Sequence, residues 1–176
     1  MMAGGRTGPL GVVTAPHPAL VRSATPVDPL DDAVTAVAAC LLATMRGLSG
    51  CHGLAAPQLG LGWRLMCLDV SGNPSSRSCA GEVVIANPEV VEAARWEAAR
   101  EGCLSVPGLV AEVPRATRVT VRGVRPGTGE PLTVHADAFE ARCVQHLIDH
   151  LDGLLFLDRV AGARAVHPAR KGGQAA

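Results

Sequence analysis

The sequence predicts an α+β fold in which short antiparallel strands surround one buried helix. Three observations support this fold class. Apolar residues recur every three or four positions in two long segments, and they alternate with polar residues in shorter ones. Turn-forming residues separate the shorter segments closely enough for hairpins. No repeat or linker divides the 176 residues, so we expect a single domain at residues 10–162, between a flexible N-terminus (1–9) and a flexible tail (163–176).

The first predicted helix begins near Asp28 and ends near Gly47. Asp28 can cap the helix, Pro29 suits its first turn, and Asp31 and Asp32 favour the positive end of the helix dipole. A glycine can terminate the last turn. The apolar positions that recur at spacings of three and four are Leu30, Val34, Val37, Leu41 and Met45.

Four short strands are predicted after this helix. Residues 64–70 and 83–87 are apolar and flank a loop at 71–82 that is rich in glycine, serine and proline. Residues 118–125 alternate with period two, and the turn PGTGE then leads into 131–136, which predicts a hairpin.

The second predicted helix runs from about Asp137 to Leu151, with Gly153 just beyond it. One apolar stripe along it contains His146 and His150, one turn apart. Such a pair can share a metal ion, or the two can be core histidines that are hydrogen-bonded to neighbours. Burying two imidazoles costs free energy unless both find partners, and a metal ion would serve both.

Composition excludes several classes of function. Lys+Arg and Asp+Glu both number 16, so no excess charge favours direct nucleic-acid binding or an anionic membrane. No apolar run approaches the roughly 20 residues of a membrane helix. The N-terminal residues do not resemble a secretory signal, and the six cysteines form no tight framework, so we expect a cytoplasmic protein with mostly buried thiols.

Three segments together resemble the peptide deformylase family. CHGLAAPQ (51–58), EGCLS (101–105) and QHLIDH (145–150) match, in order, the family motifs G-x-G-x-A-A-x-Q, E-G-C-L-S and Q-H-E-x-D-H. The resemblance spans roughly residues 10–160, including ANPE at 86–89. It implies a peptide deformylase-like fold with a buried metal-binding helix.

The resemblance implies one divalent metal ion bound by Cys103, His146 and His150. Taken alone, Cys103 would be interpreted as a small buried hydrophobe. Three protein ligands leave one position open, which is the pattern of a catalytic rather than a structural site. Fe²⁺ is usual in the family, with Zn²⁺, Ni²⁺ or Co²⁺ as substitutes, and this ligand set suits several of them.

The resemblance also assigns catalytic and substrate-binding positions. The Gln58 amide and the Leu104 backbone N–H match the two donors to the oxyanion, and Gly53 matches a glycine along which the substrate backbone lies. Gln58 can alternatively be a loop amide that caps its own turn.

Three further positions match residues that surround the ligands. Glu101 lies at the substrate site and, with Arg115 and Asp149, is expected to orient the ligands and brace the metal helix. Arg115 can alternatively form a plain surface salt bridge.

Three positions depart from the family pattern, and the first is Cys51, which replaces the first glycine of the family motif matched by CHGLAAPQ. Leu147 replaces the glutamate that takes a proton from the attacking water and passes it to the leaving amine, a loss that typically costs about 10²–10⁴-fold in rate. His52 replaces a small aliphatic residue beside the pocket for the methionine side chain. A histidine there narrows or polarises the pocket and could move protons near neutral pH. It can alternatively point to solvent.

The leading functional hypothesis is a peptide deformylase-type metallohydrolase that removes the formyl group from N-formylmethionyl peptides or nascent chains, with activity impaired by Leu147. One alternative is a non-catalytic metal-binding paralogue that binds formylated peptides or a partner. Another is an amidohydrolase that acts on a different acyl substrate. Leu147 favours the alternatives, whereas the complete ligand set favours a site still in use.

Overall fold

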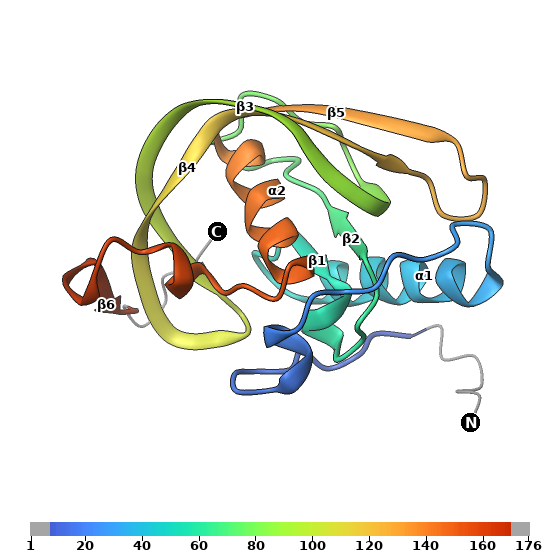
Figure 1. Cartoon of the computed structure of the whole chain (residues 1–176), viewed down its shortest axis with the longest axis horizontal. Coiled ribbons are helices and arrows are strands. Elements are labelled where there is room, and N and C mark those ends of the chain that lie inside the picture. Colours follow the sequence, from blue (N-terminus) through green and yellow to red (C-terminus); the bar gives the residue numbers. More distant parts are fainter. Residues whose placement is uncertain (1–7, 170–176) are drawn as a thin grey trace.

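The computed structural model describes residues 8–169, which form a six-stranded antiparallel sheet and two α-helices (Figure 1). Most of the predicted flexible N-terminus and the last residues of the predicted tail lie outside this range. The strands are β1 (Gly53–Ala55), β2 (Leu65–Leu68), β3 (Val83–Cys103), β4 (Val106–Val124), β5 (Pro131–Asp137) and β6 (Val166–Pro168). The helices are α1 (Asp32–Gly47) and α2 (Ala138–Leu151), with 3-10 turns η1 (Pro18–Val21), η2 (Ala56–Leu59), η3 (Phe156–Arg159) and η4 (Ala163–Ala165).

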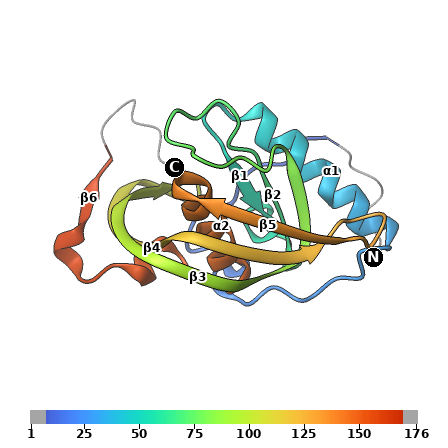
Figure 2. The same cartoon turned by 90° about the horizontal axis from the view of Figure 1, so that it is seen from above.

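The sheet has the order β1-β2-β3-β4-β5. Strand β5 pairs with the C-terminal half of β4, and β6 pairs with β4 near its N-terminal end. The predicted α+β class is confirmed, but β3 and β4 are not short, since they contain 21 and 19 residues. Register shifts in β3 after Ala86 and Val90 let both strands bend, and Figures 1 and 2 show them curving around α2. The curved hairpin thus encloses the helix that carries the two motif histidines.

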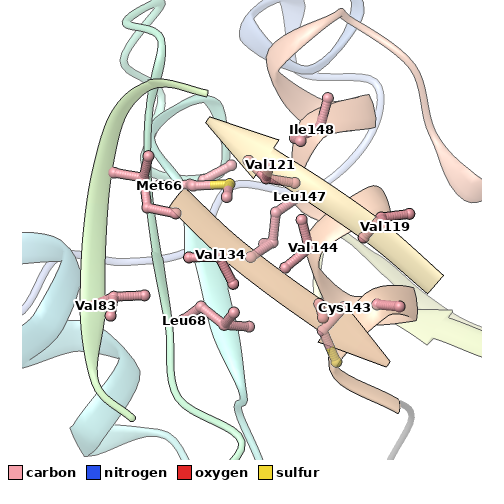
Figure 3. Packing of buried hydrophobic residues seen from close by; sticks show 14 of the residues in the cluster. Met66, Leu68, Val83, Val119, Val121, Val134, Cys143, Val144, Leu147 and Ile148 are labelled. Carbon is pink, nitrogen blue, oxygen red and sulfur yellow. The ribbon is translucent and has the colours of Figure 1, made fainter. Parts of the chain in front are cut away.

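Helix α2 forms the centre of the larger apolar core and begins within one residue of its predicted start. Its buried apolar side chains meet residues of β2, β4 and β5. Figure 3 shows Leu147 beside Val121, Val134 and Val144. Leu147 is only 3% exposed, so the residue that replaces the family glutamate belongs to the hydrophobic core.

Helix α1 packs with β1 and β2 in a second apolar cluster. It begins at Asp32, four residues after the predicted start, because Asp31 caps it by accepting a 2.8 Å hydrogen bond from the Ala33 N–H. Asp28 instead accepts from the Leu30 N–H within the preceding turn. The helix ends at Gly47, as predicted.

The segment after α2 includes residues 163–168 of the predicted tail, which form regular structure. Residues 163–165 form η4, and Val166–Pro168 pairs as β6 with Leu109–Ala111 of β4. Backbone hydrogen bonds to a sheet edge hold this segment, and hydrophobicity does not indicate such bonds. Within residues 8–169, neither helix has the length and hydrophobicity needed to cross a membrane.

Candidate metal centre and its cavity

The three predicted ligands lie together where the end of β3 meets α2. Cys103 is the last residue of β3, and His146 and His150 project from consecutive turns of α2. The Cys103 Sγ lies 3.2 Å from the His150 Nε2. One ligand atom of each residue lies within 4.8 Å of those of the other two. Motifs that are more than 40 residues apart in sequence therefore form one cluster.

The Cys103 thiol differs from the buried thiols of Cys67 and Cys143 in its pKa. Burial would raise the pKa of Cys103, but hydrogen bonds with His146 and His150 outweigh burial and lower the pKa to about 5. Burial instead raises the pKa of Cys67 and of Cys143 to about 12. Because the thiolate is the form that binds metal, Cys103 is the buried cysteine that is prepared for it.

Glu101 fixes the orientation of His146. Its buried carboxylate receives two hydrogen bonds from Arg115, at 2.9 and 3.0 Å, and one from Arg142 at 2.8 Å. The His146 Nδ1 lies 3.1 Å from Glu101 Oε2, so Nδ1–H donates to the carboxylate and Nε2 faces Cys103, where a cation would replace the Nε2 proton. Burial would raise the pKa of Glu101, but the bonds from His146 and Arg115 lower it to about 2.

Arg115 also links this cluster to the end of α2. It donates to Asp149, which is paired on its other side with Arg159 at 2.7 Å. Arg115 is only 3% exposed, so a plain surface salt bridge is excluded. Because Asp149 immediately precedes His150, these ion pairs hold the second histidine against β4.

The residues present suit a divalent cation. Four-coordinate ligands at ordinary Zn–S and Zn–N bond lengths lie about 3.5 Å apart, so small side-chain movements would bring this cluster to that spacing. Cysteine and imidazole are donors that iron, nickel, cobalt and zinc all accept. Among the described residues, the Nδ1 of His150 is the buried side-chain nitrogen without a hydrogen-bond partner. A cation on Nε2 would compensate for the cost of burying this ring.

A cavity of about 290 Å³ opens beside the cluster and is lined by residues of all three motifs. Gln58 is buried on its wall, and its Oε1 accepts a 3.0 Å hydrogen bond from the Ala55 N–H. Its Nε2 then points toward Cys103 Sγ at 3.7 Å and Ser105 Oγ at 3.4 Å. Gln58 therefore caps its own turn and, by doing so, directs its N–H donors into the site. Leu104 lies in the turn between β3 and β4 and also lines the cavity.

Gly53 and Leu147 pack directly against each other on the cavity wall. A Cβ at Gly53 would lie 2.6 Å from Leu147 Cδ1 and 2.9 Å from the Cys67 carbonyl oxygen. This approach requires a glycine at position 53 in the presence of Leu147. Leu147 itself presents hydrocarbon to the cavity where the family motif has a carboxylate.

Both ring nitrogens of His52 are engaged by the loop that follows β2. Nδ1 lies 3.4 Å from the Asp69 carbonyl oxygen, and Nε2 lies 3.1 Å from Asn73 Nδ2. The ring also meets Phe139 edge-on, with centroids 5.1 Å apart. His52 is half-buried and lines the cavity, so it does not simply point to solvent.

Two residues at the site were not indicated by sequence reasoning. Arg142 lies one turn before His146 on α2 and lines the cavity while bonded to Glu101. An arginine beside the apolar stripe of a buried helix was the available signal for it. Ser105 is fully buried, and its backbone N–H donates to Cys103 Sγ at 3.4 Å. A serine in a tight turn gives no comparable signal.

Three candidate ligands beside an open cavity, with the Gln58 amide directed toward them, fit the class of mononuclear catalytic metal sites. The chain belongs to the polypeptide deformylase family, whose model matches residues 9–165.

Relatives and solved structures agree with this membership. Peptide deformylase 2 of Gloeobacter violaceus is 38% identical over 161 residues, which cover 91% of this chain and 83% of that protein. The peptide deformylase of Bartonella tribocorum is 40% identical over 155 residues, with 85% and 83% covered. A crystal structure of a peptide deformylase from Legionella pneumophila matches with a TM-score of 0.79 at 33% identity, covering 90% of this chain and 89% of that one. The Met-Ala-Ser-bound class I type b peptide deformylase of Acinetobacter baumannii matches with a TM-score of 0.78 at 32% identity, covering 88% and 100%.

Proposed function

We propose that the chain is a peptide deformylase-type metallohydrolase that removes the formyl group from N-formyl peptides, with N-formylmethionyl peptides and nascent chains as the substrates expected from the family. The observation that carries this proposal is the cluster of Cys103, His146 and His150 on the wall of a cavity into which Gln58 directs its amide. Fe²⁺ is the ion we propose, and Zn²⁺, Ni²⁺ or Co²⁺ would fit the same donors. The free cysteines of the described chain fit the cytoplasmic location that we propose.

The residues around the ligands supply positioning and charge stabilisation. A divalent cation at this site would polarise the formyl carbonyl and lower the pKa of a water molecule. The Gln58 amide and the Leu104 backbone N–H are the donors we assign to the negative charge that develops on the carbonyl oxygen. Glu101 sets the tautomer of His146, and Arg115 and Asp149 hold the helix that carries both histidines.

The described side chains on the cavity wall lack a free group to carry protons in place of the lost glutamate, and both ring nitrogens of His52 are engaged by the loop after β2. Leu147 has no titratable group, and the Glu101 carboxylate is fully bonded to Arg115, Arg142 and His146. The Cys51 thiol donates to the Gly53 carbonyl, and burial raises its pKa. Proton transfer would therefore depend on water alone. We expect turnover to be about 10²–10⁴-fold lower than with a positioned general acid/base.

A second candidate function is binding of formylated peptides without turnover. The observation that favours it is the hydrocarbon surface that Leu147 presents to an otherwise complete site. Such a protein would keep the ligands, the cavity and the peptide affinity, and would release no formate.

One experiment separates the two candidates. Formate release from formyl-Met-Ala-Ser is measured with Fe²⁺- or Ni²⁺-loaded protein, and peptide binding is measured in parallel by calorimetry. Cys103→Ser, which removes a ligand, provides the background rate. Slow release above that background supports the hydrolase. Binding with release equal to the background supports the binding protein, and neither binding nor release would refute both.

A further inference from the structure

A second cavity adjoins the metal cavity behind Arg142. Its volume is about 640 Å³, and Gly50, His52 and Arg142 line both cavities. Its remaining wall comes from the loop after β2, from β3 and β4, and from the start of α2. The two cavities are therefore neighbours whose walls share these three residues.

The wall of the second cavity carries an excess of positive charge. Arg77, Arg100 and Arg142 line it, opposed by the single carboxylate of Glu97. Within residues 8–169, the side chains of Arg77 and Arg100 have neither a hydrogen bond nor an ion pair. Arg100 is the cross-strand neighbour of Glu112, yet the two form no salt bridge.

The charge of Arg142 is only partly compensated by carboxylate. Its Nη1 donates to Glu101 at 2.8 Å, but that carboxylate is shared with Arg115, and the other acceptors of Arg142 are the neutral backbone carbonyls of Val113 and Glu97. Asp149, the other carboxylate of this buried group, is shared between Arg115 and Arg159. Three arginines thus divide two carboxylates, and a further anion beside Arg142 would be favourable.

This wall suits a carboxylate better than a thioether. A methionine side chain placed here would cover the guanidinium groups of Arg77 and Arg100 without bonding to them, which costs free energy. A carboxylate can pair with a guanidinium through two parallel hydrogen bonds. Arg142 and His146 lie on one face of α2, four residues apart, and both bond to Glu101. The side chain of an aspartate or glutamate whose formyl group is held at the ligands would extend along this wall toward Arg142.

We propose that this second cavity, lined by Arg77, Arg100 and Arg142, is the side-chain subsite for the first residue of the formyl peptide, and that it takes an acidic side chain in place of methionine. The proposal rests on the proposed function, because it takes the metal cavity as the formyl site. It keeps the reaction and changes the class of substrate to N-formyl peptides that begin with aspartate or glutamate.

The test compares formyl-Glu-Ala-Ser, formyl-Gln-Ala-Ser and formyl-Met-Ala-Ser on the metal-loaded protein, by calorimetric binding and by formate release. We expect the glutamate peptide to bind at least about tenfold more tightly than the other two, because only its side chain forms charged hydrogen bonds with the arginines. The preference should shrink at high salt, since Arg77 and Arg100 are exposed.

A double variant identifies the source of the preference. Arg77→Gln/Arg100→Gln changes two exposed side chains, so the fold should persist, and the preference should fall several-fold. Arg122→Gln/Arg125→Gln removes the same charge from exposed positions of the β4–β5 hairpin outside both cavities, and should leave the preference intact.

Two results would overturn the subsite: equal or tighter binding of the methionine peptide, or an acidic preference that the Arg77→Gln/Arg100→Gln variant retains in full. Formate release from the methionine peptide would then leave the proposed function standing. An acidic binding preference without formate release from any peptide would instead support the subsite and refute the hydrolase.

Discussion

His146 and Leu147 are consecutive residues of α2 that lie in opposite surroundings. Around His146, Glu101, Arg115 and Asp149 form a buried network of ion pairs. Around Leu147, the neighbours are the apolar side chains of the main core and the bare Cα of Gly53. One half of the site holds ligands in place, and the other half, where the family motif has a proton carrier, is hydrocarbon.

In this chain, the residues that hold the candidate ligands are therefore distinct from the position where the family motif has its proton carrier. Leucine and glutamate are similar in size, so Leu147 fills its position in the core without disturbing the ion pairs one residue away. The network around His146 has no such tolerance, because removing one partner leaves another buried charge uncompensated.

Loss of a ligand should abolish metal binding. We expect about one equivalent of Fe²⁺ or Ni²⁺ per chain in the parent and far less in Cys103→Ser and His150→Ala, as measured by elemental analysis after desalting. Cys143→Ser is the matched control, because Cys143 is a buried cavity thiol outside the cluster of ligand atoms. A full equivalent retained in both ligand variants would refute the assignment.

Restoring a carboxylate to the hydrocarbon half should raise turnover. Leu147→Glu recreates the motif QHEIDH, and we expect kcat/KM for formate release to rise by about 10²–10⁴-fold at matched metal content. The cation would offset part of the cost of burying the new charge. Leu147→Gln is the control, since it has nearly the same shape and carries no titratable proton. An equal gain in both variants, or no gain in a folded and metal-loaded Leu147→Glu, would show that proton transfer is not what limits the reaction.

Breaking the ion-pair half should destabilise the metal-free fold. Arg115→Met leaves Glu101 and Asp149 with fewer partners, and we expect the free energy of unfolding to fall by about 3–5 kcal/mol, as measured by urea denaturation. Arg46→Met is the control: Arg46 forms an ion pair with Glu82 on the surface and should matter little. Similar losses in the two variants would mean that burial of the Arg115 network has no special energetic role.

The sequence predicted the parts of the site that depend on local pattern. Helix α2 and its ligand histidines follow from helical periodicity, and the β4–β5 hairpin follows from alternation and turn chemistry. The middle of β3 was not predicted, because residues 92–100 read EAARWEAAR and consist largely of good helix formers. Their pairing with β4 overrides that local preference, and only tertiary structure reveals it.

Contacts between distant segments also lay beyond the sequence. The resemblance named Glu101 and Arg115, but their mutual bonds and the addition of Arg142 depend on how β3, β4 and α2 cross. For the same reason, the sequence did not decide whether His52 replaces the lost glutamate. The hydrogen bonds of its ring now give a definite expectation.

The smallest effect is expected for His52. Its two ring nitrogens face the Asp69 carbonyl and the Asn73 side chain, so its hydrogen bonds hold the loop after β2 and leave none for the metal cavity. His52→Val should therefore change residual formate release far less than the 10²–10⁴-fold expected for loss of a proton carrier. The measurement is kcat/KM between about pH 5 and pH 8, the range in which histidines commonly titrate, with metal content matched to the parent.

An unchanged pH profile would confine His52 to the pocket wall and the loop. Loss of turnover together with a changed profile would instead mean that His52 carries protons in place of the glutamate that Leu147 replaces.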